Sequence, residues 1–378
     1  MKLRKAAALV LVTVMAATVF AGCGKGNTGE GETKGADREK ALDLRTLTQD
    51  EIEEGAKKEG RVSSVGMPDE WAHWDLSWAS ILEKYGLEHD DVDLSSGEEI
   101  ATFVAEKDDP TKDVGDVGYA FTSTAMDEGC LQPYKVSSWD SIPEWAKDPD
   151  GNWTVSYTGT TCFIFNDAAI EGELPTTWQE LMDSEIVVNM GNVVGGASSQ
   201  ANILACAIAM GGGFDNVQPG IDYFKKLAEQ GRIHPSEGQV SEMVSGEVEC
   251  FGGRFDFNGT AWADEYNAQE LEGLHITTVI PQDGAITTGY ALIINKWAPH
   301  PHAAAQTVEY MLSEEGQIER AYGGARPIRS DVEIPEDAPV LGDEWYENTT
   351  SPESADALQE ACDEIARLWE EEVIPLLG

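Results

Sequence analysis

Residues 61–85 read RVSSVGMPDEWAHWDLSWASILEKY. The pattern of 61–65 predicts a short strand, and the Gly-Met-Pro sequence of 66–68 predicts a turn. From Glu70 to Tyr85 the large apolar residues recur at helical spacing, and Gly86 ends this predicted helix. Because strands and helices alternate in this way along the chain, the sequence predicts mainly parallel sheets covered by helices on both faces, an α/β fold.

The remaining elements are predicted from the same patterns. Thr48-Gln-Asp-Glu51 has the spacing of a capping box and opens a helix that stops at Gly60. Strands are predicted near 92–94, 114–121, 153–157, 162–166, 186–189, 248–251, 276–280 and 285–295. Helices are predicted over 98–106, 124–129, 178–182, 198–210, 221–229, 259–266, 303–312, 314–321 and 355–369. A length of 378 residues predicts two domains, or three small ones.

The N-terminus indicates where the protein is located. Basic residues precede an apolar run too short to span a bilayer, so residues 1–22 are predicted to be a secretory signal peptide. Phe20-Ala-Gly-Cys23 resembles a bacterial lipobox, in which the signal is cut before Cys23 and its thiol is lipidated. The Gly-rich charged stretch that follows cannot bury apolar surface, so residues 23–45 are expected to be a lipid-anchored flexible linker. The expected location is extracytoplasmic, at the cell membrane, with the lipid as the only membrane contact.

The charge of the chain excludes several classes of partner. It has 25 Lys and Arg against 69 Asp and Glu, a formal net charge of −44. Nucleic-acid binding needs a basic surface that displaces counterions, so nucleic acid is excluded as a partner. Besides Cys23 there are five cysteines, an odd number that excludes complete disulfide pairing and leaves their redox states open: Cys130, Cys162, Cys206, Cys250 and Cys362.

A family resemblance rests on short motifs that occur in a fixed order. They are GCLQPY at 129–134, IPEW at 142–145, DPDGNW at 148–153, FIFN at 163–166, LPTTWQEL at 174–181, APHPHAA at 298–304, LSEEGQ at 312–317 and ARPIR at 325–329. Over residues 58–330 the chain resembles the extracellular solute-binding proteins of bacterial ABC importers. The resemblance is to the group that contains ferric-ion, phosphonate, thiamine and spermidine/putrescine binders.

This resemblance implies a type 2 periplasmic-binding fold, with two α/β lobes and a hinged ligand cleft between them. Crossover strands are implied near 158–165 and 285–294. Lobe 1 would combine residues 50–160 with 283–330, and lobe 2 would combine 161–282 with 331–378. The implied function is to capture a small polar solute by lobe closure and to deliver it to the permease subunits of the importer.

Ligand-binding residues are expected where strands end, because ligands in open α/β sheets bind beyond the carboxyl ends of the strands. This rule selects Met67, Asp69, Trp71, Ser95, Ser96, Tyr119, Thr122, Thr158, Thr160, Ser198, Ser199, Arg254, Asp256, Thr287, Thr288 and Tyr290. The serines are also typical N-caps of helices. Trp71, Trp74 and Trp78 share one helical stripe, which leaves open whether Trp74 and Trp78 lie in the core or in the cleft.

Two sets of residues suggest different solutes. A carboxylate pairs with an ammonium group and aromatic rings attract cations, so an amine site would use Asp69, Asp256, Trp71 and Tyr290. A phosphate or phosphonate site would use Arg254 and the predicted helix N-termini at Ser95 and Ser198. In ferric binders of this group, adjacent tyrosines stand where this chain has Phe255-Asp256, so a ferric site would lack its main ligands. We favour an amine or polyamine, with a phosphonate or phosphorylated solute or ferric ion as alternatives.

Catalytic and metal-binding motifs are not found in the sequence. There is no GxSxG, HExxH or Walker loop, and the single GxGxxG match lies in the predicted linker. His300-Pro-His302 is more typical of a helix start than of a metal site. No catalytic residue, metal or cofactor is therefore predicted, and a secreted hydrolase or a surface adhesion protein is the alternative of a different class.

Overall fold

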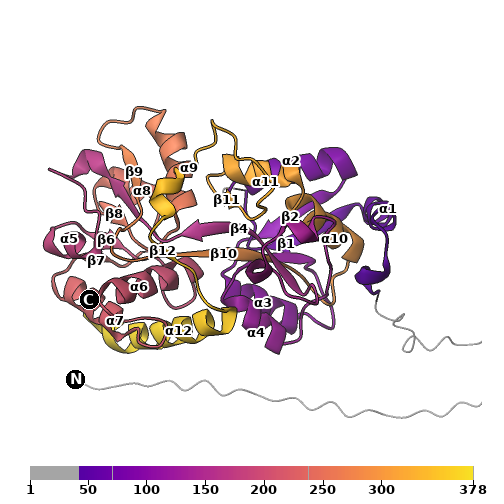
Figure 1. Ribbon diagram of the computed structural model, residues 1–378, viewed down its shortest axis with the longest axis horizontal. Helices are drawn as coiled ribbons and strands as arrows, with labels where there is room; N and C mark the ends of the chain where they lie inside the picture. Colours follow the sequence, from indigo (N-terminus) through magenta and orange to yellow (C-terminus); the bar gives the residue numbers. More distant parts are fainter. Residues whose placement is uncertain (1–41, 70, 237, 378) are drawn as a thin grey trace, which may run out of the picture. The chain divides into compact units, whose positions relative to one another are not determined.

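Two sheets organise the part of the chain that the computed structural model describes, residues 42–69, 71–236 and 238–377 (Figure 1). The seven-stranded sheet has the order β11 (Arg326–Pro327), β4 (Trp153–Thr160), β10 (Ala285–Ile294), β3 (Val114–Gly118), β1 (Arg61–Val65) and β2 (Glu88–Val92), with β12 (Thr349–Thr350) paired to β10. The five-stranded sheet has the order β7 (Ile233–His234), β6 (Val188–Asn189), β8 (Cys250–Phe251), β5 (Phe163–Asn166) and β9 (Ile276–Val279). We call the part built on the first sheet lobe 1 and the part built on the second sheet lobe 2.

Both sheets are mixed, which corrects the expectation of mainly parallel strands. In lobe 1, β1 runs parallel to β2 and β3, whereas β10 runs antiparallel to β3 and β4. In lobe 2, β6 runs parallel to β7 and β8, whereas β5 runs antiparallel to β8 and β9. The antiparallel pairs include the strands next to the points where the chain passes between the sheets. The α/β class and the two-lobe architecture themselves are confirmed.

The chain passes between the two sheets after β4 and again after β9. β4 ends at Thr160 and β5 begins at Phe163, while β9 ends at Val279 and β10 begins at Ala285. The two passages are hydrogen bonded to each other, because Thr161 N donates to Ile286 O (3.0 Å) and Ile286 N donates to Thr161 Oγ1 (2.9 Å). The division of the lobes into 50–160 plus 283–330 and 161–282 plus 331–378 stays a prediction.

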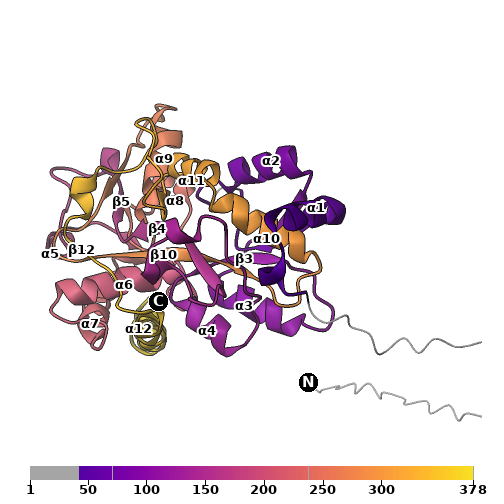
Figure 2. The same ribbon diagram turned by 45° about the vertical axis from the view of Figure 1, so that its right-hand side comes forward.

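Helices cover both faces of the lobe 1 sheet. α2 and α11 lie on one side of it, and α3 and α4 lie on the other (Figures 1 and 2). The C-terminal helix α12 packs along α6 of lobe 2 and also reaches α4 of lobe 1. The helices are α1 (Gln49–Glu59), α2 (Trp74–Tyr85), α3 (Ser96–Ala105), α4 (Phe121–Asp127), α5 (Trp178–Asp183), α6 (Ala197–Ala209), α7 (Gln218–Glu229), α8 (Val240–Ser245), α9 (Asp256–Asn267), α10 (Pro301–Met311), α11 (Glu314–Tyr322) and α12 (Ala355–Leu368).

Several element boundaries differ from the sequence-based prediction. The helix predicted from Glu70 begins at Trp74, because Ala72 and His73 have left-handed φ values of +47° and +50° that no α-helix accommodates. The strand predicted at 92–94 lies at 88–92. β7, β11 and β12, of two residues each, were not predicted.

The interior of lobe 1 resolves the question about its tryptophans. Trp74 and Trp78 are buried in the core, whereas Trp71 is only partly buried.

Cys130, Cys162, Cys206, Cys250 and Cys362 are all free and buried. Within the described residues no helix is both long and apolar enough to cross a membrane. The predicted signal peptide 1–22, Cys23 and the linker up to residue 41 lie outside the described residues. The end of the predicted linker is not flexible, because Leu44 is buried in the core and begins the short 3-10 helix Leu44–Thr46.

Candidate functional site

A cleft of about 390 Å³ lies where the two lobes meet. Loops after β1 and β2 and the first turn of α3 line it from lobe 1, while the first turn of α6 and the segments before α8 and α9 line it from lobe 2. The lining residues are Gly66, Pro68, Trp71, Asp93, Leu94, Ser95, Ser96, Glu98, Glu99, Asp116, Asn192, Gly196, Ala197, Ser198, Ser199, Gln239, Arg254 and Tyr290. Strand ends and helix N-termini converge here, as expected of a ligand site in an α/β protein.

Two aromatic rings, Trp71 and Tyr290, line the cleft in lobe 1 and pack against the buried ring of Tyr157. Trp71 Nε1 donates a hydrogen bond to the Tyr157 hydroxyl (2.7 Å), which in turn donates to Asp116 Oδ2 (2.6 Å). The rings of Tyr157 and Tyr290 stack with centroids 5.5 Å apart, and Trp71 meets Tyr290 edge to face at 5.6 Å. These contacts fix the indole of Trp71 at the surface of the cleft.

The loop that carries Trp71 is held by a buried arginine. Ala72 and His73 adopt left-handed backbone conformations, which cost about 1–3 kcal/mol each for residues other than glycine. The guanidinium of Arg320, which is fully buried, donates to the carbonyl oxygens of both residues and lies over the Trp74 ring at 3.8 Å. Arg320 therefore stabilises a strained loop whose conformation places Trp71 in the cleft.

Two buried carboxyl groups lie side by side at the base of the cleft. Asp116 and Glu99 are 2% and 1% exposed, and Asp116 N donates to Glu99 Oε2 (3.1 Å). The Glu99 carboxylate lies so close to Gly66 and Gly115 that a side chain at either position would collide with it. Asp116 Oδ2 accepts from Tyr157, and the indole N–H of the buried Trp74 is directed at the same carboxyl group.

Burial changes the ionisation of this pair. It raises the pKa of Asp116 to about 7, although the hydrogen bond from Tyr157 and the charge of Arg320 act in the opposite direction. It raises the pKa of Glu99 well above the usual range, with the negative charge of Asp116 adding to the effect. A cation bound beside Asp116 and Glu99 would favour the ionised carboxylates and lower both pKa values.

The lobe 2 side of the cleft is formed by a helix N-terminus, serine hydroxyl groups and an arginine. Helix α6 begins in the cleft with Gly196 as its N-cap and no acidic residue in its first turn. The hydroxyl groups of Ser198 and Ser199 donate to Gly253 O at 3.0 and 3.3 Å, which fixes this turn against the segment before α9. Arg254 follows directly, and its Nη2 donates to Gly238 O (3.1 Å) at the edge of the cleft.

The two walls approach each other closely beside the cleft. A Cβ atom at Gly118 in lobe 1 would lie 2.5 Å from the Cβ of Ala197 in lobe 2. A Cβ atom at Gly195 would lie 3.6 Å from Ser95 Oγ, at the start of α3. Gly118 therefore permits an approach of the lobes that a larger residue would prevent.

Seven of the residues predicted from the sequence line this cleft: Trp71, Ser95, Ser96, Ser198, Ser199, Arg254 and Tyr290. Two others lie beside it, with Met67 buried and Asp69 exposed. Tyr119 and Thr122 instead line a separate hollow with Trp145 and Trp153, whose rings meet Tyr119 at 5.8 and 5.6 Å.

The other predicted residues lie at the passages between the lobes. Thr158, Thr160, Thr287 and Thr288 are on β4 and β10, where Thr160 Oγ1 and Thr287 Oγ1 are 2.8 Å apart. Asp256, which is 2% exposed, accepts hydrogen bonds from Thr160 N (2.7 Å) and the Tyr346 hydroxyl (2.6 Å). Burial raises the pKa of Asp256 to about 6. Both carboxylate oxygens of Asp256 thus hold protein groups together and neither faces the cleft.

Sequence reasoning missed the carboxylates of the cleft, Asp93, Glu98, Glu99 and Asp116. One signal was present, because Asp116 interrupts an otherwise apolar and small stretch, VGDVGYAF, that was predicted as a strand. A carboxylate inside a buried strand needs a partner or a function. Glu99 gave no such signal, since an acidic residue in the first turn of a helix is ordinary.

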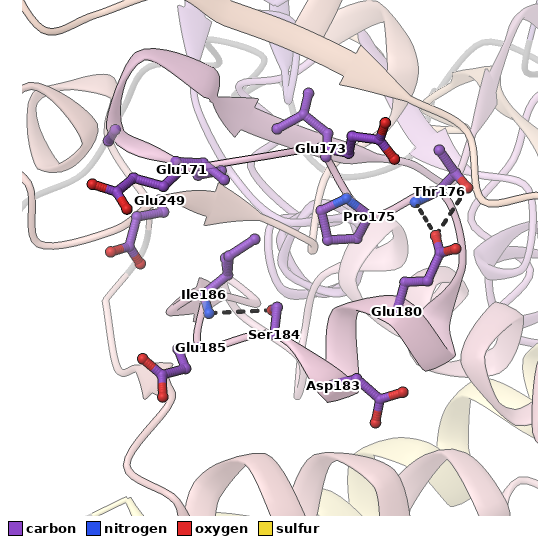
Figure 3. A pocket seen from close by; sticks show the side chains of 13 residues that line it. Glu171, Glu173, Pro175, Thr176, Glu180, Asp183, Ser184, Glu185, Ile186 and Glu249 are labelled. Atoms are coloured by element: carbon purple, nitrogen blue, oxygen red, sulfur yellow. Dashed lines mark hydrogen bonds between the residues drawn. The ribbon is translucent and has the colours of Figure 1, made fainter.

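A larger hollow of about 720 Å³ lies within lobe 2, around α5. Figure 3 shows that carboxylates surround it, namely Glu171, Glu173, Glu180, Asp183, Glu185 and Glu249. Glu180 accepts from Thr176 N and Thr176 Oγ1, and Glu249 accepts from Val187 N. None of the predicted site residues lines this hollow, and the described residues contain no acidic, histidine or cysteine group arranged to hold a metal ion.

Comparison with known proteins agrees with this geometry. Residues 109–345 match the family described as "Bacterial extracellular solute-binding protein". The periplasmic binding protein AfuA from Actinobacillus pleuropneumoniae, with fructose-6-phosphate bound, has 20% identity and a TM-score of 0.66 over 83% of this chain and 98% of its own. Iron-bound HitA from Pseudomonas aeruginosa has 18% identity and a TM-score of 0.65 over 83% and 99%. The Atu4243-GABA receptor has 17% identity and a TM-score of 0.60 over 82% and 96%. No curated protein gives a significant sequence match.

Proposed function

Since the chain belongs to the family of bacterial extracellular solute-binding proteins, we propose that its interlobe cleft binds a small solute that carries an amine. The protein is the solute-binding component of an ABC importer and not an enzyme. Closure of the lobes around the solute requires contacts to both of them, because only differential affinity shifts the equilibrium between open and closed arrangements.

The carboxylates of the cleft carry the proposal for an amine. Asp116 and Glu99 are buried next to each other at the cleft, and Asp93 and Glu98 line it as well. An ammonium group supplies a positive charge that offsets these carboxylates. Trp71 and Tyr290 line the same cleft, and aromatic faces add cation–π attraction.

An anionic solute is the second candidate, and one observation favours it. The N-terminus of α6 and the guanidinium of Arg254 line the cleft together, an arrangement that suits a phosphate or phosphonate. AfuA, of similar fold, was solved with fructose-6-phosphate. Ferric ion is the third candidate, because HitA has a similar fold and was solved with iron, but this chain has Phe255-Asp256 where ferric binders of the resembling group have adjacent tyrosines.

The amine proposal is tested by comparing two buried aspartates. Asp116→Asn should weaken the binding of 1,4-diaminobutane, spermidine or 4-aminobutanoate, whichever binds best, by about ten- to hundredfold, since a charge-assisted hydrogen bond contributes about 1.5–3 kcal/mol. Asp256→Asn is the matched control, because Asp256 is equally buried and lies outside the cleft lining. Affinities are measured by isothermal titration calorimetry. Equal losses in both variants, or no amine binding to the wild type, would contradict the proposal.

We also propose that lipid on Cys23 tethers the receptor to the outer face of the cell membrane after removal of residues 1–22. The support is the sequence Phe20-Ala-Gly-Cys23 and the extracellular family. The part of the predicted linker that precedes residue 42 would then give the described part of the chain the freedom to reach the permease subunits.

A further inference from the structure

The C-terminal segment, residues 341–373, contacts both lobes. Leu341, Trp345 and Tyr346 pack against an apolar cluster built mainly of lobe 2 residues, and β12 then pairs with β10. Beyond β12, helix α12 lies along α6 of lobe 2 and reaches α4 of lobe 1 (Figure 1). The family match ends at residue 345, so α12 lies outside the residues that match the family.

The start of this segment is held by groups of both lobes. The Tyr346 hydroxyl donates to Asp256 Oδ2 of lobe 2 (2.6 Å), and the guanidinium of Arg326 on β11 lies over the Tyr346 ring at 4.4 Å. Arg326 Nη2 also donates to Asp343 Oδ1 (2.6 Å). Because Asp256 also accepts from Thr160 N at the end of β4, these contacts lie beside a passage between the sheets.

Helix α12 itself is attached to lobe 2. Its buried side chains are Leu358, Ala361, Cys362, Ile365 and Leu368. Beyond its end, the Trp369 ring meets Phe224 of α7 edge to face at 5.7 Å, and Lys225 Nζ donates to Glu372 Oε2 (2.6 Å). These buried and paired contacts fix α12 to α6 and α7, so we expect it to move with lobe 2.

The contact of α12 with lobe 1 is small and exposed. Ser123 Oγ on α4 donates to Asp356 Oδ1 in the first turn of α12 (2.6 Å), and the backbone N–H of Ala355 donates to the Tyr119 hydroxyl. A hollow of about 420 Å³ lies between α4 and residues 353–356 at this place, and none of these residues lines the interlobe cleft. Exposed hydrogen bonds of this kind are weaker than the apolar burial that holds α12 on lobe 2.

We propose that the first turn of α12 is a latch, which holds the lobes in the arrangement described here and releases α4 when they separate. The helix stays on lobe 2, while Ser123 and Tyr119 move away with lobe 1. Because α12 packs along α6, whose first turn lines the cleft, the latch acts on the same movement that a bound solute drives. It favours the closed arrangement before any solute binds, so the inference does not depend on which solute the cleft takes.

Two substitutions of one residue test the latch on the solute-free protein. Ser123→Asp places a second carboxylate against Asp356 and should release the latch, whereas Ser123→Lys can pair with Asp356 and should keep it. Small-angle X-ray scattering should therefore give a larger radius of gyration for Ser123→Asp than for the wild type and Ser123→Lys. Hydrogen–deuterium exchange should become about tenfold faster in residues 355–358 of Ser123→Asp and stay unchanged in 361–368.

Ser141→Asp is the matched control. Ser141 Oγ donates to Asp331 Oδ2 (2.9 Å) in a similarly exposed serine–aspartate pair away from α12, so this variant should keep the wild-type radius of gyration. Unchanged scattering and exchange in Ser123→Asp would overturn the inference, and so would equal expansion in Ser123→Lys. Faster exchange over the whole of α12 would also overturn it, because the helix would then be leaving lobe 2 rather than lobe 1.

Discussion

Asp116→Asn should make the protein more stable at neutral pH while it weakens solute binding. The carboxyl group of Asp116 is buried beside Glu99. Burial raises the pKa of Asp116 from the ordinary 3.8 to about 7 in the folded protein. As the pH rises from 3.8 to 7, the unfolded chain loses this proton and the folded protein retains it, so the wild type loses stability across this interval.

The size of the effect follows from the two pKa values. At 1.36 kcal/mol per pKa unit, the interval from 3.8 to about 7 corresponds to about 4 kcal/mol. An asparagine does not titrate, and its amide oxygen can still accept from the Tyr157 hydroxyl. The stability difference between the variant and the wild type should therefore be near zero at pH 4, grow between pH 4 and 7, and level off above pH 7 at up to about 4 kcal/mol in favour of the variant.

Urea unfolding followed by tryptophan fluorescence at pH 4, 6 and 8 measures this difference. Asp256→Asn is again the control, and its profile should differ because both oxygens of Asp256 accept hydrogen bonds from Thr160 and Tyr346. A stability difference for Asp116→Asn that is the same at pH 4 and pH 8 would refute the reasoning. It would mean that the folded protein does not hold the extra proton at this carboxyl group.

Two further predictions concern closure and anchoring. Gly118→Leu should lower solute affinity at least tenfold, because its side chain would collide with Ala197 in the arrangement of the lobes described above and hold the two walls apart. Small-angle X-ray scattering should then show no compaction on adding solute, and compaction equal to that of the wild type would contradict this. Cys23→Ser should release the protein from the membrane fraction of expressing cells and abolish its metabolic labelling with palmitate, whereas a labelled Cys23→Ser variant would exclude lipidation at this residue.

The sequence was informative about the order of elements and about the ends of strands. The capping box at Thr48 and Glu51 and the helix end at Gly60 are present in the structure, because such local patterns act within one turn of backbone. The rule that ligands bind beyond strand ends selected Trp71, Arg254 and the serines at the starts of α3 and α6, which do line the cleft. Each of these features depends on residues within a few positions of each other.

Contacts between distant segments decided the rest. Asp256 was selected by the same strand-end rule, yet Thr160 and Tyr346 occupy both of its oxygens, and no local pattern reports those partners. Asp116 and Glu99, on different elements, become a buried pair only when α3 packs on β3. The sequence by itself determined the α/β class and the strand-end loops, whereas tertiary packing decided which carboxylates face the cleft, because burial and pairing of charges depend on neighbours far away along the chain.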